Sequence, residues 1–130
     1  MSAKVLVADD EAHILHVVSM KLRNAGLDVV TAVDGEEALD VCLAERPNLV
    51  ITDFQMPYMT GLELCVAMRE QGLQTPAILL TARGFDIEPD EMIRAGIAAV
   101  LAKPFSPREV LAKVQALLDS LPQTSEASQG

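Results

Sequence analysis

Acidic, hydroxyl and amino side chains follow apolar runs at four widely separated places in the 130-residue sequence. The residues that end these runs are Asp9 and Asp10 (run 4–8), Asp53 (49–52), Thr81 (77–81) and Lys103 (98–102). In an open parallel sheet, ligands bind outside the carboxyl ends of the strands, near the point where strand order reverses. The runs therefore predict three carboxylates, one hydroxyl and one ammonium on a single rim.

This set of side chains indicates phosphoryl chemistry assisted by a metal. Carboxylates that share a pocket raise one another's pKa values unless a cation compensates them. Mg²⁺ prefers oxygen ligands and is commonly held by one or two carboxylates plus a phosphate. Asp53 is the candidate nucleophile, because the following "FQMPYMTG" predicts a loop that leaves its carboxylate exposed, and a carboxylate can attack phosphorus. Thr81 and Lys103 suit the oxygens of the phosphoryl group, and the small Ala82 leaves the approach open.

Five β-α units are predicted to position these residues. Apolar runs alternate with amphipathic stretches, a pattern typical of parallel strands joined by crossover helices. The runs 4–8, 49–52 and 77–81 are continuously apolar, as expected for strands covered on both faces, whereas 28–32 and 98–102 are weaker and suit edges. The fold class is therefore α/β, a doubly wound parallel sheet with helices on both faces.

Local signals place the helix boundaries. Capping residues with an acid three positions on occur at Asp34, Thr60 and Ser106, and Gly26, Gly72 and Gly96 follow helical stretches. Pro89 is tolerated only in a first turn, so the fourth helix is predicted to be short and to begin near 86–89, with 82–86 as a loop. One domain is expected over 1–120, and 121–130 is expected to be a flexible tail or linker stub.

Five separately placed motifs carry a resemblance to a known family. "VADDEA", "ITDFQMP", "TG", "LLTA" and "LAKPF", in this order and spacing, resemble the receiver domain of two-component response regulators. The resemblance covers 4 to about 120 and implies a flavodoxin-like strand order 2-1-3-4-5. It also implies phosphorylation of Asp53 by a sensor histidine kinase or phosphotransfer protein, which switches binding to an output partner.

Further roles are implied by the resemblance alone. Asp10, Asp53 and the backbone carbonyl of Gln55 would ligate Mg²⁺, for which Mn²⁺ can substitute, and Asp9 would act through a metal-bound water. Thr81 and Lys103 would each bond a phosphoryl oxygen. The Lys103–Pro104 bond is expected to be cis, and the module catalyses its own phosphorylation and slow dephosphorylation rather than acting as an enzyme on other substrates.

Val100 departs from the family pattern. Most receivers carry Tyr or Phe three residues before the lysine, and that side chain turns inward when the threonine hydroxyl moves to the phosphate. With Val100 there, phosphorylation is expected to persist while the usual output route through the fourth helix and fifth strand is in question. Arg83 lies two residues after Thr81, and two interpretations of it are equally supported. It either modulates the entry of the phosphoryl group or is a loop residue with no role.

Composition narrows the class of partner. The net charge of -9 argues against direct nucleic-acid binding, which depends on neutralising phosphates, and favours a protein partner or a cation. No apolar run is long enough to span a bilayer, so a cytoplasmic protein without membrane contact is expected. Cys42 and Cys65 are predicted to be buried hydrophobes, and His13 and His16 are predicted to lie on a solvated face that His16 shares with Ser19 and Arg23.

Competing functions differ in their sequence requirements. A flavin carrier needs a hydroxyl- and glycine-rich loop after the first strand, and a dinucleotide-binding domain needs G-x-G-x-x-G, and neither is present. A phosphatase of the haloacid dehalogenase type also uses an aspartyl nucleophile, Mg²⁺, Thr and Lys, but it needs a second Asp where this chain has Gln55. A receiver-like fold used only for docking is the third alternative.

Overall fold

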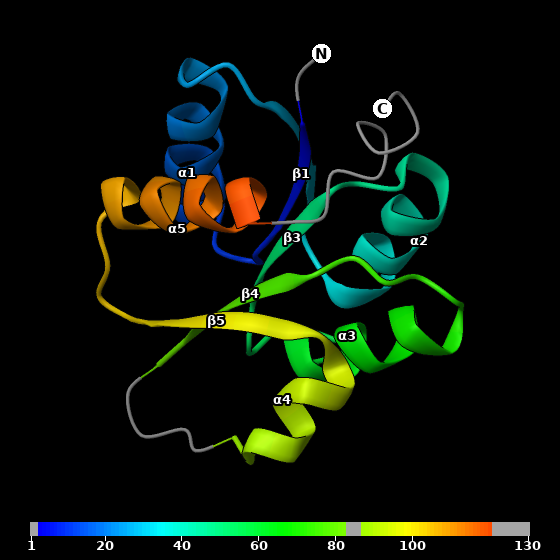
Figure 1. Cartoon of the computed structure of the whole chain (residues 1–130). Coiled ribbons are helices and arrows are strands. Elements are labelled where there is room, and N and C mark those ends of the chain that lie inside the picture. Colours follow the sequence, from blue (N-terminus) through cyan, green and yellow to red (C-terminus); the bar gives the residue numbers. More distant parts are fainter. Residues whose placement is uncertain (1–2, 83–86, 121–130) are drawn as a thin grey trace.

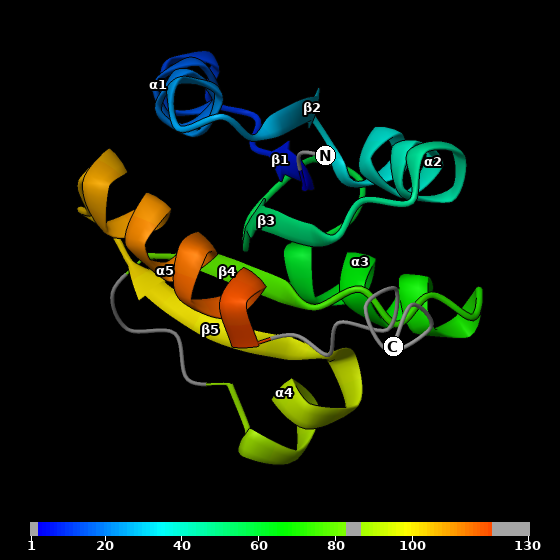
Figure 2. The same ribbon diagram turned by 45° about the horizontal axis from the view of Figure 1, so that its top comes forward.

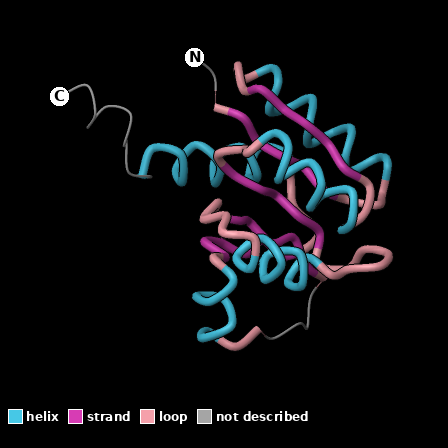
Figure 3. Tube along the Cα trace, turned by 90° about the vertical axis from the view of Figure 1, so that its right-hand side faces the viewer, coloured by secondary structure: helices cyan, strands magenta, loops and turns pink. Residues whose placement is uncertain are grey.

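The computed structural model describes residues 3–82 and 87–120. Strands and helices alternate along the chain, as Figures 1 and 3 show. The strands are β1 (Lys4–Ala8), β2 (Asp28–Ala32), β3 (Leu49–Asp53), β4 (Ala77–Thr81) and β5 (Ile97–Ala102). The helices are α1 (Ala12–Asn24), α2 (Gly35–Glu45), α3 (Gly61–Glu70), α4 (Pro89–Ala95) and α5 (Pro107–Ser120).

All five strands pair in parallel in the order β2-β1-β3-β4-β5. The predicted α/β class, strand order and edge positions of β2 and β5 are therefore confirmed. Every residue of β3 and β4 is buried, which explains why their sequences are continuously apolar until the terminal residues of each strand.

Alternate residues of each strand point to opposite faces of the sheet. Val5 and Val7 pack with buried residues of α1 and α5, whereas Leu6 and Ala8 pack with buried residues of α2, α3 and α4. Figure 2 shows the two helical layers on either side of the sheet. Helices thus cover both faces, and the polar strand ends remain at one rim.

The predicted helix caps are present. The side chain of Asp34 accepts from the Glu37 backbone N–H at 2.8 Å, and Thr60 and Ser106 make the reciprocal contacts of a capping box with Glu63 and Glu109. Gly26, Gly72 and Gly96 all have positive φ. Helix α4 is short and has Pro89 at its start, with Gly96 at its end, as predicted.

Two of the predictions concern segments that the structure describes only in part or not at all. Of the loop predicted at 82–86, only Ala82 is described, and the expected tail at 121–130 lies outside the described residues.

His13 and His16 are exposed as predicted, but Ser19 is 2% exposed. The inference of a shared solvated face was therefore wrong for Ser19, because it lies at helical spacing beside Val18 and Leu22, the buried residues with which α1 packs on the sheet. In the described part of the chain, no helix has both the length and the apolar character needed to cross a membrane.

Candidate functional site

The carboxyl ends of β1 and β3 bring three carboxylates together. Ligand atoms of Asp9, Asp10 and Asp53 all lie within 4.8 Å of one another. The two strands are neighbours in the sheet, with Ala8 paired to Thr52, so the residues that follow this pair meet at the rim. The sequence pattern predicted this convergence, and it is the feature that makes the rim a candidate site.

Asp9 is fully buried beneath this cluster. Its Oδ1 atom accepts a hydrogen bond from the Glu11 backbone N–H at 2.8 Å, while its Oδ2 atom has no hydrogen-bond partner among residues 3–82 and 87–120. Burial, opposed by the hydrogen bond from the Glu11 N–H and assisted by the nearby charge of Asp53, raises the pKa of Asp9 to about 6. A buried carboxylate oxygen without a partner is costly, so the position suits a cation or a bound water.

Asp53 is much less exposed than the sequence suggested. The residue is 5% exposed, because the loop after β3 folds back over it: Gly61 at the start of α3 donates its N–H to the Phe54 carbonyl at 2.7 Å. Burial raises the pKa of Asp53, and the hydrogen bond from Lys103 lowers it. Asp53 lines one of the cavities at this rim.

Lys103 is the positive charge of the site. Its Nζ atom lies 3.2 Å from Asp53 Oδ1 and 3.0 Å from Glu11 Oε1. Burial would lower the pKa of Lys103, but the hydrogen bonds to Glu11 and Asp53 outweigh burial and raise it. The backbone N–H of Lys103 bonds the Thr81 carbonyl at 2.8 Å, and the Lys103–Pro104 bond is cis, as expected.

Glu11 is a member of the site that the sequence did not reveal. The candidate residues predicted from the sequence did not include it, but the structure places it at the N-cap of α1 with its side chain paired to Lys103. An acid one position past Asp10, on a rim already expected to hold a lysine, was the available signal. The rim therefore holds four carboxylates and one ammonium among the described residues.

Thr81 makes a local contact in this structure. It is 4% exposed, and its Oγ1 atom donates to the Ala82 carbonyl at 3.1 Å. Thr81 thus lies at the rim as predicted, with its hydroxyl bonded to backbone. Ala82 is exposed beside it, and Arg83 lies outside the described residues.

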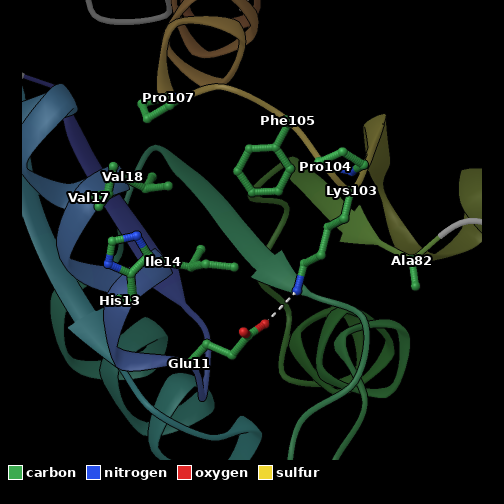
Figure 4. Close-up of a pocket in the computed structure, with 10 residues that line it drawn as sticks. All are labelled: Glu11, His13, Ile14, Val17, Val18, Ala82, Lys103, Pro104, Phe105 and Pro107. Carbon is green, nitrogen blue, oxygen red and sulfur yellow. Dashed lines mark hydrogen bonds and ion pairs between the residues drawn. The ribbon is translucent and has the colours of Figure 1, made fainter.

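Two cavities meet at this rim. The smaller, about 430 Å³, is lined by Asp10, Glu11, Asp53, Phe54, Gln55, Ala82 and Lys103. The larger, about 520 Å³, lies between α1 and the β5–α5 connection and is lined mainly by apolar side chains, including Ile14, Val17 and Phe105. Figure 4 shows Lys103 reaching across the edge of the larger cavity to Glu11.

Val100 and Tyr58 are two of the exposed large residues, one on β5 and one in the loop after β3. Val100 pairs with Leu79 across β4 and β5 and is 36% exposed. Tyr58, in the loop after Asp53, is 80% exposed and has a φ of 71°, a conformation that is uncommon for a bulky residue.

The donor set fits a hard divalent cation. Three carboxylates converge, one of them with a buried oxygen lacking a described partner, and oxygen donors of this kind are the ligands that Mg²⁺ prefers. Gln55 lines the same cavity, so its backbone carbonyl is close enough along the chain to Asp53 to be a candidate donor. Neither cysteine takes part, because Cys42 and Cys65 are both buried in the core.

Comparison with known sequences gives consistent matches. The family model of the response regulator receiver domain matches residues 5–115. The chain is 41% identical over 118 residues to the alkaline phosphatase synthesis transcriptional regulatory protein PhoP of Bacillus subtilis. It is 40% identical over 115 residues to the probable transcriptional regulator ycf27 of Cyanophora paradoxa. These alignments cover 91% and 88% of this chain but 49% and 48% of the relatives, so the chain spans about half their length.

Comparison with solved structures gives matches that cover nearly the whole of two neighbouring chains. The chemotaxis response regulator CheY4 of Vibrio cholerae superposes with a TM-score of 0.81 at 38% identity, over 89% of this chain and 98% of that one. The receiver domain of the Francisella response regulator 1452 gives a TM-score of 0.81 at 34% identity, over 89% and 96%.

Proposed function

The chain belongs to the response regulator receiver domain family, and on this premise we propose that Asp53 accepts a phosphoryl group in a two-component phosphorelay. One observation carries the proposal above the others: the buried Asp53 carboxylate lies 3.2 Å from the Lys103 ammonium and within 4.8 Å of the carboxylates of Asp9 and Asp10. The proposed nucleophile, the proposed phosphate-binding ammonium and Asp10 therefore line one cavity, and Asp9 is buried beside it.

The transfer uses the carboxylate of Asp53 directly. One of its oxygens forms a bond to the phosphorus of the donor while the bond from phosphorus to the donor's leaving group breaks. For a phosphohistidine donor the leaving group is the imidazole, and for a small acyl phosphate it is a carboxylate. Lys103 stabilises negative charge on the phosphoryl oxygens, and Thr81 is the proposed hydroxyl donor once its bond to Ala82 is given up.

Asp10, Asp53 and the Gln55 carbonyl are the proposed direct ligands of Mg²⁺, with Mn²⁺ as a substitute, and Asp9 is proposed to act through a water. When bound, the cation supplies neutralisation of negative charge at the phosphoryl oxygens. The unpartnered Oδ2 atom of Asp9 supports a role for this residue in holding the site's cation or its water.

The partners follow from the same chemistry. A sensor histidine kinase or phosphotransfer protein is the proposed donor, and an output protein or domain is the proposed reader of the phosphorylated state. The chain spans about half the length of two relatives named as a transcriptional regulatory protein and a probable transcriptional regulator, which supports a receiver that acts on an output protein or domain. Val100, Ala82 and Arg83 are proposed to modulate rate or output, and the receiver module is proposed to extend over 1–120, with 121–130 as a tail or linker.

The decisive experiment measures the covalent adduct. The native chain is incubated with Mg²⁺ and acetyl phosphate, and intact mass spectrometry should detect one added phosphoryl group, which is absent when EDTA replaces Mg²⁺. Asp53→Asn should abolish the adduct. Asp28→Asn is the matched control, because Asp28 is exposed at the opposite end of a strand, and it should leave the adduct intact.

Two results would contradict the proposal. A native chain that forms no adduct and binds no beryllofluoride in the presence of Mg²⁺ would be a docking module rather than a phosphoacceptor. Hydrolysis of a small phosphate ester at enzyme rates, lost in Asp53→Asn, would instead indicate a phosphatase.

A further inference from the structure

Glu11 is the carboxylate of the rim that the proposed phosphoryl transfer does not use. Its Oε1 atom lies 3.0 Å from Lys103 Nζ, and the same nitrogen lies 3.2 Å from Asp53 Oδ1. The Lys103 ammonium is therefore shared between Asp53, the proposed phosphoacceptor, and Glu11, which lies 92 residues before Lys103 in the sequence.

The backbone of Glu11 is fixed while its side chain reaches across the rim. Its N–H donates to Asp9 Oδ1 at 2.8 Å, which ties it to the metal-binding cluster. Glu11 is the N-cap residue of α1, yet its side chain makes no capping hydrogen bond. A side chain at this position commonly accepts from the first turn of the helix, and here the carboxylate is directed to Lys103 instead.

The ion pair lies where the two cavities of the rim meet. Glu11, Ala82 and Lys103 line both the cavity of Asp53 and the larger apolar cavity beside α1. Figure 4 shows the pair at the edge of the apolar cavity, with Lys103 extending from Pro104 toward the start of α1. A phosphoryl group on Asp53 would therefore approach the nitrogen that Glu11 already holds.

The two contacts of Lys103 differ in how easily they break. The side chain of Glu11 is 58% exposed, whereas that of Asp53 is 7% exposed. Exposed ion pairs contribute little stability and exchange readily with water. A phosphoryl group carries roughly -1.5 to -2 charge, so it attracts Lys103 more strongly than Glu11 does and repels the Glu11 carboxylate.

We propose that Glu11 is a positioning residue that holds Lys103 toward α1 in the unphosphorylated protein and is displaced when a phosphoryl group occupies Asp53. The proposal rests on the proposed function. Because the Glu11 contact with Lys103 is lost when the site is occupied, Glu11 weakens the binding of phosphoryl groups. Glu11 thereby shifts the equilibrium between the resting and the occupied form toward the resting form.

The test measures beryllofluoride affinity by calorimetry on the full chain at saturating Mg²⁺. Glu11→Gln should bind beryllofluoride about threefold to tenfold more tightly than the native chain, since one weak ion pair and one repulsion are removed. Glu70→Gln, the same change at an exposed position at the C-terminal end of α3, should stay within about twofold of native, because α3 starts at the rim and ends at the opposite edge of the sheet, and distant exposed charges are largely screened. Unchanged or weaker binding by Glu11→Gln overturns the proposal.

Glu11→Asp separates position from charge. This variant keeps the negative charge but shortens the side chain by one methylene, so it no longer reaches Lys103. If the contact with Lys103 matters, Glu11→Asp should bind beryllofluoride more tightly than native, though less tightly than Glu11→Gln. Affinity equal to native would assign the effect to charge alone and overturn the positioning role.

A structure of the native chain with Mg²⁺ and beryllofluoride gives a second readout that needs no variant. Lys103 should contact the fluoride group, with Glu11 Oε1 beyond the 3.0 Å contact of the present structure and out of ion-pair range. Persistence of the pair overturns the proposal. If the native chain binds beryllofluoride and Glu11→Gln binds it with the same affinity, only this inference fails. If the native chain shows no Mg²⁺-dependent binding of beryllofluoride, both the proposed function and this inference fail.

Discussion

The Lys103 ammonium and the Asp53 carboxylate approach to 3.2 Å although their strands are not neighbours. Strand β4 lies between β3 and β5, so the lysine side chain crosses the end of β4 to reach the acid. Thr81 ends that middle strand, and its carbonyl accepts the Lys103 backbone N–H at 2.8 Å. Lys103 therefore connects Asp53 to the ends of both β4 and β5.

Lys103→Ala should separate phosphorylation from its structural consequence. The adduct with acetyl phosphate should still form, because Asp53 and the proposed metal ligands remain. The change in hydrogen exchange that phosphorylation produces in β4 and β5 should be lost, because the ammonium that links the phosphoryl group to β5 is gone.

Lys113→Ala is the matched control for this variant, since Lys113 is exposed on α5. It should keep both the adduct and the exchange response. An equal exchange response in Lys103→Ala and the native chain would contradict the assigned role.

The stability of the metal-free protein should fall as pH rises. The pKa of Asp9 is 3.8 in the reference state and about 6 in the folded protein, so the folded state holds the extra proton between these values. Its stabilising contribution is complete below 3.8 and is lost as pH passes about 6. The loss should amount to about 2 kcal/mol of unfolding free energy, measured by urea denaturation in EDTA at pH 4.5 and 7.5.

Asp9→Asn is the control for this pH dependence, because it removes the titrating group. The difference between the two pH values should shrink by the same amount in the variant. Saturating Mg²⁺ should also raise the stability of the native chain at the higher pH, since binding to the folded state alone stabilises it. A native chain that is more stable at pH 7.5 in EDTA, with no change in Asp9→Asn, would refute the assignment to Asp9.

Patterns of local sequence were enough to predict the sheet and the rim. The apolar runs of β3 and β4 and the capping residues Asp34 and Thr60 each reflect a local rule, so the strand positions and helix starts were predictable. Parallel strands then force Asp10, Asp53 and Lys103 onto one edge, wherever the intervening helices lie.

Side-chain reach and loop closure were not predictable in the same way. The burial of Asp53 depends on the chain at Gly61 folding back over it, and the Glu11–Lys103 pair depends on how a helix start faces a distant strand. Ser19 has polar character, but its burial follows from how α1 packs on the sheet beside Val18 and Leu22. These features are set by tertiary packing, which overrides local propensity.

Gly61→Ala should damage both the fold and the site. An added Cβ would overlap the backbone carbonyl oxygen of Asp53 and lie 2.8 Å from Leu79 Cδ1, so the loop would have to move away from β3. Overpacking of this kind costs about 1–3 kcal/mol, measurable by urea denaturation, and the beryllofluoride affinity should fall with it.

Gly72→Ala is the control, because Gly72 has positive φ but open space around the position of a Cβ. It should cost about 1 kcal/mol from backbone strain and leave beryllofluoride affinity unchanged. Equal losses of affinity in the two variants would show that Gly61 has no particular link to Asp53.

Val100→Tyr should leave the phosphoacceptor chemistry intact. Val100 is 36% exposed on β5 and lines neither cavity of the rim, so the rate of adduct formation with acetyl phosphate should stay within about twofold of native. The exchange response of β5 and α4 to phosphorylation should increase, because an aromatic ring there can occupy different positions in the two states. Val66→Tyr, at an exposed position on α3, is the control. A large change in rate without any change in response would refute this division.

Arg69→Lys should loosen α4 although it keeps the positive charge. The guanidinium of Arg69, on α3, donates to three backbone carbonyls, those of Ala95, Leu73 and Thr75, and so joins the end of α4 to the connection before β4. A lysine has no planar fork of donors and cannot satisfy three separated carbonyls at once. Gly96 permits the approach, because a Cβ there would overlap the guanidinium.

The expected cost of Arg69→Lys is about 1–3 kcal/mol, the range for lost hydrogen bonds to a charged group. Hydrogen exchange should accelerate most in α4, because this helix has seven residues and therefore few internal hydrogen bonds. Arg94→Lys, at an exposed position in the last turn of α4, should change stability by less than about 0.5 kcal/mol. Two outcomes would contradict this role of Arg69: equal losses of stability in the two variants, or unaltered hydrogen exchange of α4 in Arg69→Lys. In either case the apolar contacts of Ala95 and Met92 with the core, and not the hydrogen bonds of Arg69, would hold α4 in place.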